Sequence, residues 1–369
     1  MCHLLASLLL LVLAFVLNPL LLPSVVCSRL CPRHCLCYEN TDLVDCRDRG
    51  LEHVPRGLPH GTWLLELRGN NLSEICTRAF AGLWSLRVLV LANSHIRTLQ
   101  PQAFFSLSYL EKLDLSDNRL TSLPADFSVG LSALRVLRLE HNNLDHLSAF
   151  SFEYLDNVEK MDLSHNHLVS VSPGVFRGLS RLRQLYLQNN RLSVMHQGSL
   201  DMLPGLEVLQ LSHNNISLID TKALTPLYNL AVLDLEGNNL RHLKFKTFLN
   251  LHTTATHIQL AVVVSSPGNP WTCDCELHRV FSKILHVRHL HIDDYRNVTC
   301  HQPPQLAGAS LAWVDSKLCI AETATVLVIT VTVLVTVVAA VVMAERNRKR
   351  NRGKNWDTES QNQTHSPPS

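Results

Sequence analysis

The chain has 369 residues and carries 33 Lys and Arg against 31 Asp and Glu, a net charge of +2. A charge this close to zero excludes the broad basic surface with which proteins usually hold nucleic acid. The length alone allows two or three domains, so the internal pattern has to decide the organisation.

Residues 1–27 contain a long apolar run, LLASLLLLVLAF, and end in the small residues Val25 and Cys27. This pattern predicts a signal peptide that is cleaved before Ser28. A signal anchor retained in the membrane is the alternative, because no strongly basic segment precedes the run. Of 11 cysteines, two would leave with the peptide, and eight of the other nine form two clusters. Such clustering is typical of disulfides in an oxidising compartment.

The first cluster lies in residues 28–61 and has the spacing C-x3-C-x-C-x8-C, formed by Cys31, Cys35, Cys37 and Cys46. Disulfides are favoured over a zinc site, because the chain is predicted to be secreted and no matching histidine spacing accompanies the thiols. We interpret this segment as a cap that covers the first coil of the array that follows.

Residues 62–253 repeat one pattern, L-x-x-L-x-L-x-x-N-x-L-x-x-L followed by F-x-x-L, eight times at a constant spacing. The repeats start at Thr62, Leu86, Leu110, Leu134, Val158, Leu182, Leu206 and Leu230. The sixth position is Leu in every repeat, and the ninth is Asn in seven repeats and Ser94 in the other. A buried Asn at a turn both donates to and accepts from neighbouring backbone. A period of about 24 residues with this pattern predicts a leucine-rich repeat array, an α/β solenoid shaped like a horseshoe.

The side chains between the inward leucines of each strand should form the concave face of the solenoid. The central outward row reads Glu66, Val90, Asp114, Arg138, Asp162, Tyr186, Gln210 and Asp234. Eight strands about 4.8 Å apart give a face roughly 35–40 Å long, which suits a protein epitope better than an enclosed small ligand. Asp114, Arg138, Asp162 and Tyr186 are the candidate contacts, since Tyr and Arg commonly anchor protein interfaces. A solvated face with the partner bound elsewhere remains the alternative.

Histidines recur at the eighth position of three repeats, as His141, His165 and His213. They are interpreted as polar residues tolerated where the chain leaves the strand, although a pH-responsive surface is the alternative. They are not predicted to be metal ligands. Cys76 stands alone among the repeats and is interpreted as inert, with a free reactive thiol or an intermolecular link as alternatives.

After the eighth repeat a strand resumes one residue late, and Asn269 arrives six residues beyond its expected place. Removing residues 262–267 would restore the pattern, so these residues form either a bulged loop or an irregular insertion. The motif NPWTCDC then begins at Asn269, with further cysteines at Cys300 and Cys319. Residues 254–319 resemble the C-terminal cysteine cap of extracellular leucine-rich repeat proteins, and the first cluster resembles its N-terminal counterpart.

The resemblance implies the pairs Cys31 with Cys37, Cys35 with Cys46, Cys273 with Cys300, and Cys275 with Cys319, and it places Trp271 beneath the cap. His and Asp also cluster between His286 and Tyr295, but neighbouring strand residues point to opposite faces. A metal or catalytic site is therefore not favoured there. No cofactor, metal or catalytic residue is predicted, and the chain is predicted not to be an enzyme. Asn71, Asn215 and Asn297 stand in N-x-S/T sequons and are candidate glycosylation sites.

Residues 324–344 form a run of 21 residues without a charge, long enough to cross a hydrocarbon core of about 30 Å. Six Lys and Arg follow between Arg346 and Lys354, and positive charge marks the cytoplasmic side. This pattern predicts a single-pass type I protein of the plasma membrane with its amino terminus outside. Residues 345–369 are predicted to be a basic, disordered cytoplasmic tail.

The complete pattern resembles short-tailed, single-pass leucine-rich repeat membrane proteins, a group that includes trophoblast glycoprotein and auxiliary gamma subunits of potassium channels. The resemblance implies a cell-surface recognition or adhesion protein that binds an extracellular protein on its concave face. The alternative is an auxiliary subunit or co-receptor that modulates a channel or a signalling receptor, for example in the Wnt pathway, within the same membrane. The repeat motifs define the scaffold, which many functions share.

Overall fold

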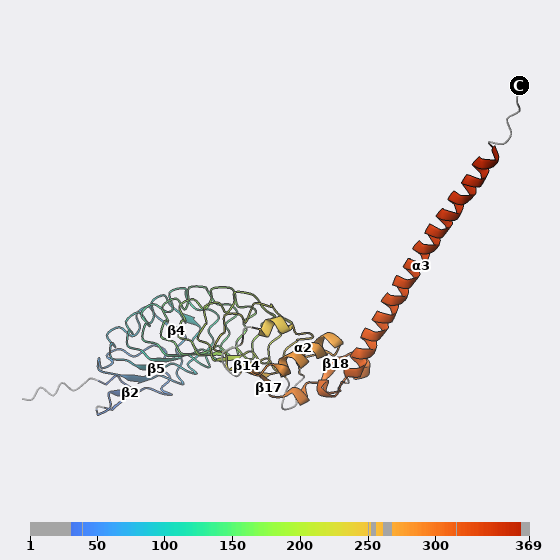
Figure 1. The fold of residues 1–369 in the computed structure, drawn as a ribbon. Helices are drawn as coiled ribbons and strands as arrows, with labels where there is room; N and C mark the ends of the chain where they lie inside the picture. The colour runs from blue at the N-terminus through green and yellow to red at the C-terminus, as the bar shows by residue number, and fades with distance from the viewer. Residues whose placement is uncertain are drawn as a thin grey trace, which may run out of the picture.

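The computed structural model describes residues 31–38, 40–249, 251, 256–260, 268–314 and 316–362, so the predicted signal peptide lies outside the described residues. The repeats coil into a curved solenoid, and one long helix leaves its C-terminal end (Figure 1). The fold is therefore the leucine-rich repeat solenoid that the period predicts.

One sheet of twelve strands forms the inner side of the coils. Its strands, in spatial order, are β1 (Leu36–Tyr38), β2 (Leu43–Asp45), β3 (Leu64–Glu66), β5 (Val88–Val90), β7 (Lys112–Asp114), β8 (Val136–Arg138), β9 (Lys160–Asp162), β10 (Gln184–Tyr186), β12 (Val208–Gln210), β14 (Val232–Asp234), β15 (Thr256–Gln259) and β17 (Leu290–Ile292). Only the first pair, β1 with β2, is antiparallel.

The register of this sheet follows directly from the repeat length. Leu65 lies opposite Leu89, the same position of the next repeat, and each later pair up to β14 is again offset by one repeat. Because every strand lies beside its equivalent in the next coil, residues one repeat apart form rows across the sheet. The remaining named strands form three two-stranded sheets: β4 (Glu74–Ile75) with β6 (Thr98–Leu99), β11 (Val194–Met195) with β13 (Leu218–Ile219), and β16 (Trp271–Thr272) with β18 (Cys300–Gln302).

Leucines fill the interior of the coils, and phenylalanines of the F-x-x-L motif form a line behind them. Phe80 stacks on Phe104 with ring centroids 5.9 Å apart, and Phe104 meets Phe127 edge-on at 5.8 Å. These rings are buried. Since each coil covers the apolar side of the previous coil, the core is a continuous column.

A ladder of buried asparagines joins the coils at the turn after each strand. The Asn142 side-chain nitrogen donates to the carbonyls of Leu115 at 2.9 Å and Leu139 at 3.1 Å, and its oxygen accepts from the Leu120 amide at 3.0 Å. Asn118, Asn166, Asn190, Asn214 and Asn238 repeat this pattern. Ser94 donates to the Leu67 carbonyl but is too short to reproduce the rest. The ladder therefore satisfies backbone groups that the leucine core would otherwise leave unpaired.

The position before each ladder residue has left-handed backbone, with φ between 50° and 73°. It is occupied by Gly69, Asn93, Asp117, His141, His165, Asn189, His213 and Gly237. Glycine adopts this conformation freely, and Asn, Asp and His are enriched there among the other residues. The recurring histidines therefore have a structural reason in the backbone.

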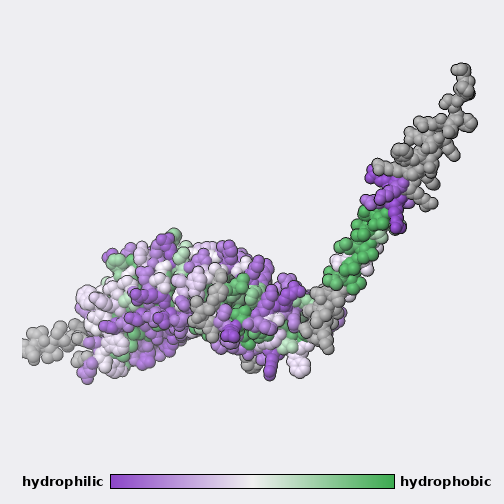
Figure 2. All heavy atoms as spheres, viewed as in Figure 1, coloured by the Kyte–Doolittle hydropathy of each residue, from purple (hydrophilic) through white to green (hydrophobic). Residues whose placement is uncertain are grey.

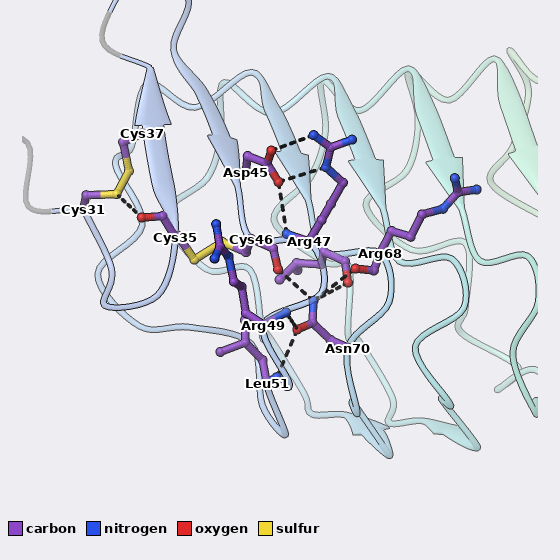
Figure 3. The surroundings of a disulfide bond; sticks show 11 residues. Cys31, Cys35, Cys37, Asp45, Cys46, Arg47, Arg49, Leu51, Arg68 and Asn70 are labelled. Atoms are coloured by element: carbon purple, nitrogen blue, oxygen red, sulfur yellow. Dashed lines mark hydrogen bonds and ion pairs between the residues drawn. A yellow bond between two sulfur atoms is a disulfide. The ribbon is translucent and has the colours of Figure 1, made fainter.

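Disulfides close both ends of the solenoid. Cys31 pairs with Cys37, and Cys35 with Cys46, beside β1 and β2 (Figure 3). At the other end Cys273 pairs with Cys300. Cys275 is also disulfide-bonded, whereas the side chain of Cys319 lies outside the described ones.

The C-terminal cap is built around α2 (Cys275–His286) and three short 3-10 helices: η2 (Tyr295–Asn297), η3 (Pro304–Leu306) and η4 (Leu311–Trp313). A further 3-10 helix, η1 (Phe245–Phe248), lies in the eighth repeat. Asp274 caps α2 by accepting from the Leu277 amide at 2.7 Å. Trp271 is fully buried and meets Phe281 edge-on at 6.0 Å, as a residue beneath the cap should.

Asn269 belongs to the asparagine ladder despite its late arrival in the sequence. Its nitrogen donates to Leu260, nine residues earlier, at 3.2 Å, whereas Asn142 donates to Leu139, three residues earlier. The extra six residues therefore leave the ladder contact intact. Residues 262–267 themselves lie outside the described residues.

Helix α3 (Ser316–Asn362) contains the apolar run, and its section Thr325–Lys349 is long and apolar enough to cross a membrane. Its apolar side chains are exposed, and Figure 2 shows an apolar band that ends in a hydrophilic segment. Thr330, Thr332 and Thr336 donate to backbone carbonyls three residues earlier in the same helix. The helix continues to Asn362, where the polar composition predicted disorder, because a helix that has already formed is extended readily by Arg, Lys, Glu and Gln.

Candidate functional site

The four predicted contact residues form one row on adjacent strands of the concave sheet. Asp114 on β7 lies opposite Arg138 on β8, Arg138 opposite Asp162 on β9, and Asp162 opposite Tyr186 on β10. The structure therefore places each of the four residues beside the next one on the adjacent strand. Among these four, only Asp114 and Arg138 form an ion pair. They form the centre of the concave row.

Arg138 does not stand free on this face. Its Nη1 lies 3.2 Å from Asp114 Oδ2, its Nε donates to Glu140 Oε1 at 2.7 Å, and its Nη2 contacts the same Glu140 oxygen. The Arg138 side chain is 38% exposed, whereas the side chains of Asp114 and Glu140 are 4% and 7% exposed. One partly exposed cation thus serves two buried carboxylates.

The carboxyl group of Glu140 is the unusual member of this cluster. Burial raises its pKa, and the hydrogen bond from Arg138 offsets only part of that effect. The hydrogen bond to Glu140 in turn raises the pKa of Arg138. Glu140 Oε2 is buried and has no hydrogen-bond partner. The sequence spacing puts Glu140 on the same face as Arg138, two residues earlier, but it gives no sign that the Glu140 side chain would be buried.

Asp162 and Tyr186 continue the row with different contacts. Asp162 Oδ1 accepts from the Ser164 hydroxyl at 2.6 Å and from its amide at 3.1 Å. The Lys160 ammonium lies 4.8 Å from the centroid of the Tyr186 ring, and the Tyr186 hydroxyl donates to Gln184 at 3.2 Å. Tyr186 therefore presents an aromatic ring that is already oriented by its neighbours.

A ladder of alternating charge runs along one rim of the sheet, at the second position of successive repeats. Arg87 pairs with Glu111 at 2.8 Å, Arg135 with Glu159 at 3.2 Å, and Arg183 with Glu207 at 3.2 Å. The strict spacing of Arg and Glu by one repeat signals this ladder, which was not among the predicted features. The pairs are exposed, so each contributes at most about 1 kcal/mol to stability.

A second acidic region lies at the C-terminal end of the face, on β14. Asp234 accepts from the Glu236 amide at 3.0 Å, and Gln259 donates to Glu236 at 2.8 Å. His213 Nε2 lies 3.8 Å from Glu236. Burial, followed by the charge of Asp234, raises the pKa of Glu236.

The histidines at the left-handed position contact one another. The rings of His141 and His165 stack with centroids 4.1 Å apart and an angle of 12°. Burial and the charge of His141 lower the pKa of His165. Stacked rings do not converge on a common point, and the described residues contain no group of three or more His, Cys, Asp or Glu that could hold a metal ion.

The His and Asp run of the C-terminal cap gives one polar pair and one structural carboxylate. His257 Nδ1 lies 2.8 Å from Asp293 Oδ1 at the exposed surface. Asp294 is buried and accepts from the Leu260 amide. Within the described part of the chain, these groups form neither a nucleophile with a base nor a metal centre.

The remaining candidate residues lie at the surface. Cys76 is an exposed free cysteine at the edge of a hollow of about 1310 Å³ lined by residues 53–61 and by the flank of the first repeat. The sequon residues Asn71, Asn215 and Asn297 are all exposed, as a glycan requires. Their modification remains a prediction.

These features define a leucine-rich repeat protein with a capped solenoid and one apolar helix. The leucine rich repeat family model matches residues 64–120, 84–144, 108–168, 132–192 and 181–240. The chain therefore contains an array of leucine-rich repeats, and no catalytic family is indicated.

Particular relatives are similar over part of their length. Leucine-rich repeat-containing protein 3 of Danio rerio is 40% identical over 88 residues, which are 23% of this chain and 33% of the relative. Leucine-rich repeat-containing protein 3B of Homo sapiens is 37% identical over 119 residues, 32% of this chain and 42% of the relative. The chain thus spans less than half the length of these curated relatives.

Solved structures match over more of the chain. Human 5T4 (Wnt-activated inhibitory factor 1, trophoblast glycoprotein) has a TM-score of 0.57 at 25% identity and covers 79% of this chain and 98% of its own. Mouse RP105 in complex with MD-1 has a TM-score of 0.57 at 25% identity, over 73% of this chain and 53% of that one. The leucine-rich repeat part of FLRT2, from an octameric complex with latrophilin 3 and Unc5D, has a TM-score of 0.60 at 24% identity, which shows the shared fold. These comparisons support a protein-binding leucine-rich repeat protein.

Proposed function

We propose that this chain is a cell-surface recognition or adhesion protein whose concave face binds an extracellular protein. The observation that carries the proposal is the row Asp114, Arg138, Asp162 and Tyr186, whose members lie side by side on four neighbouring strands. A long, open row of polar and aromatic groups fits a protein surface, and its backbone is rigid because every coil is held by its neighbours.

Three further features support a site outside the cell. Disulfides close both ends of the solenoid, and they persist in oxidising compartments. Section Thr325–Lys349 of α3 is exposed and apolar, and Arg346, Arg348 and Lys349 stand at its far end. We therefore propose a type I protein of the plasma membrane with an amino-terminal signal peptide, glycans at Asn71, Asn215 and Asn297, and a fourth bridge between Cys275 and Cys319.

The alternative function is modulation of an ion channel or a signalling receptor in the same membrane. The proximity of cap and membrane favours it: helix α3 begins at Ser316, so nine residues precede the apolar section. At 1.5 Å per residue they span about 13.5 Å. Human 5T4 carries the name Wnt-activated inhibitory factor 1, which makes a Wnt-pathway receptor one form of this alternative.

Proximity labelling on living cells tests the recognition function. The full chain, fused to a labelling enzyme, is compared with Tyr186→Ala and with the matched control Tyr228→Ala. Residue Tyr228 is 51% exposed and lies outside the concave row. We expect Tyr186→Ala to lose a subset of labelled proteins that Tyr228→Ala retains. Identical sets from all three chains would contradict binding through the concave row.

Exchanging the membrane span separates the two functions. Replacement of Thr325–Lys349 by an unrelated apolar helix of the same length leaves the concave face unchanged. Recognition by the face should then survive, whereas modulation through the span should be lost. Loss of the Tyr186-dependent labelling in the exchanged chain would favour the alternative.

A further inference from the structure

We infer that the concave face takes a basic side chain, Lys or Arg, of its protein partner at the Glu140 carboxylate. This inference rests on the proposed function and specifies the chemistry of the partner. It comes from the shortage of hydrogen-bond donors and positive charge around Asp114, Arg138 and Glu140.

Two buried carboxylates share one guanidinium at the centre of the face. Both Arg138 contacts to Glu140 fall on Oε1, and the third contact goes to Asp114 Oδ2. Glu140 Oε2 receives no hydrogen bond, even though the Glu140 side chain is buried, with only 7% of its surface exposed. A buried acceptor without a partner is unfavourable, particularly in a charged group.

The neighbouring side chains do not supply the missing donor. Ser116 and Ser164 stand on either side of Glu140 in its row, but their hydroxyls donate to Asp114 and Asp162 at 2.6 Å each. Gln188 Oε1, two repeats further along the same row, is a second buried acceptor without a partner. Both unpaired atoms are acceptors, so a complementary surface has to bring donors.

The charge of the face favours a cation in this place. The three outward rows of the eight repeats hold six acidic and four basic side chains: Glu66, Asp114, Glu140, Asp162, Asp234 and Glu236 against Arg68, Lys112, Arg138 and Lys160. Lys112 and Lys160 stand in the row on the other side of Arg138, and the Lys160 ammonium lies over the ring of Tyr186. The contacts among Asp114, Arg138 and Glu140 therefore leave one negative charge in excess.

A basic side chain of the partner resolves this imbalance by an exchange. Arg138 is the exposed member of the cluster, so its guanidinium can rotate toward Asp114 and release Glu140. The incoming Lys or Arg then takes the Glu140 carboxylate, and each carboxylate has its own cation. A close pair of charges that is desolvated in an interface is worth far more than an exposed pair.

Selected peptide loops provide the probe. A library of disulfide-closed loops of seven random residues is selected against the full chain in lipid nanodiscs. Loops that bind the wild type but bind Tyr186→Ala poorly are kept as ligands of the concave face. We expect Lys or Arg to be enriched among them and Asp and Glu to be depleted.

The affinity of one such loop is then measured with three chains. Glu140→Gln keeps the shape and removes the charge, and Glu207→Gln removes a charge from the rim ladder as the matched control. We expect Glu140→Gln to weaken the basic loop by about tenfold or more and Glu207→Gln by less than about twofold. Changing the basic residue of the loop to Gln should remove the sensitivity to Glu140.

Two contrary outcomes have different meanings. If Tyr186-dependent loops show no excess of Lys or Arg, or bind Glu140→Gln as tightly as the wild type, the basic partner is refuted while the concave face still binds. If no loop senses Tyr186→Ala, the proposed function itself fails. Thermal unfolding of each variant, measured in parallel, shows whether a loss of binding comes from loss of the fold.

Discussion

Replacing Asn142 by Ala should destabilise the solenoid strongly without changing its surface. The Asn142 side chain is buried and holds the carbonyls of Leu115 and Leu139 and the amide of Leu120 at 2.9, 3.1 and 3.0 Å. Alanine removes all three bonds. The carbonyls of Leu115 and Leu139 still accept from Asn118 and Asn166, whereas the Leu120 amide is left without its partner in a place closed to water. At about 1 kcal/mol for each bond, with the penalty for one unpaired buried amide, the loss is about 3–5 kcal/mol.

Unfolding of the full chain in detergent, with its disulfides intact, measures this loss. Tryptophan fluorescence follows the solenoid, since Trp63, Trp84 and Trp271 lie in the repeats and the cap. At roughly 2–4 °C per kcal/mol for a domain of this size, the midpoint should fall by about 6–20 °C. All variants are heated at one scan rate, because a disulfide-bonded membrane protein can unfold irreversibly.

Asn143→Ala is the matched control, since Asn143 is the adjacent asparagine and is exposed. It should change the midpoint by no more than about 1–2 °C, because surface substitutions stay within about 0.5 kcal/mol. A loss below about 1 kcal/mol for Asn142→Ala, or equal losses for the two variants, would refute the role assigned to the ladder.

Three further outcomes are expected. Ser94→Asn should stabilise the chain by about 1 kcal/mol, because an amide side chain at this position completes the ladder that the hydroxyl fills only in part. The unfolding midpoint should therefore rise, and a lower midpoint would contradict this explanation. Replacing both Cys273 and Cys300 by Ser should cost about 2–4 kcal/mol and make the cap sensitive to protease, and limited proteolysis that leaves the cap intact would oppose it. His165→Asn keeps a residue suited to left-handed backbone and should reduce the loss of stability on acidification. The pKa of His165 is lowered in the folded state, so its contribution to folding stability is complete above the unfolded pKa of about 6.5 and is lost as pH falls through the folded pKa. Unfolding midpoints between pH 7 and pH 5 measure that slope, and an unchanged slope would argue against the lowered pKa.

Most of the fold follows from the repeat alone because contacts in a solenoid join residues one period apart. The constant offset of one repeat predicts which strands are neighbours, and the alternation within each strand predicts that Leu65 points inward while Glu66 points outward. The late Asn269 could be placed for the same reason, since a ladder contact depends on the backbone of the adjacent coil.

Two further structural features are encoded at equivalent positions of the repeats. Gly, Asn, Asp and His recur at the eighth position, which is the composition expected of left-handed backbone. Arg and Glu alternate at the second position, which places Arg87 beside Glu111 and predicts the ladder on the rim. Both need a comparison of equivalent positions across repeats, because no single repeat reveals them.

The charge state of the candidate site lay beyond sequence reasoning. The period predicts that Asp114 and Arg138 are neighbours, but it does not show that Arg138 also folds back onto Glu140 two residues away. That choice depends on side-chain conformation and on the burial of Glu140. Arg138 was predicted as a candidate contact for a partner, and the structure adds that its guanidinium already contacts Asp114 and Glu140.

The scaffold and the surface use different parts of the same residues, and this explains why the repeats identify the fold but not the partner. Glu140 contributes its backbone carbonyl to the ladder, where Asn142 donates to it at 3.3 Å, and its side chain to the concave face. Exchanging the outward side chain leaves the ladder contact in place, so outward rows can change without loss of the solenoid. Arg138 is the exception, because Arg138→Ala would leave two buried carboxylates without a cation. Binding studies on this face should therefore use Tyr186→Ala and Glu140→Gln, since a loss caused by Arg138→Ala would mix binding with stability.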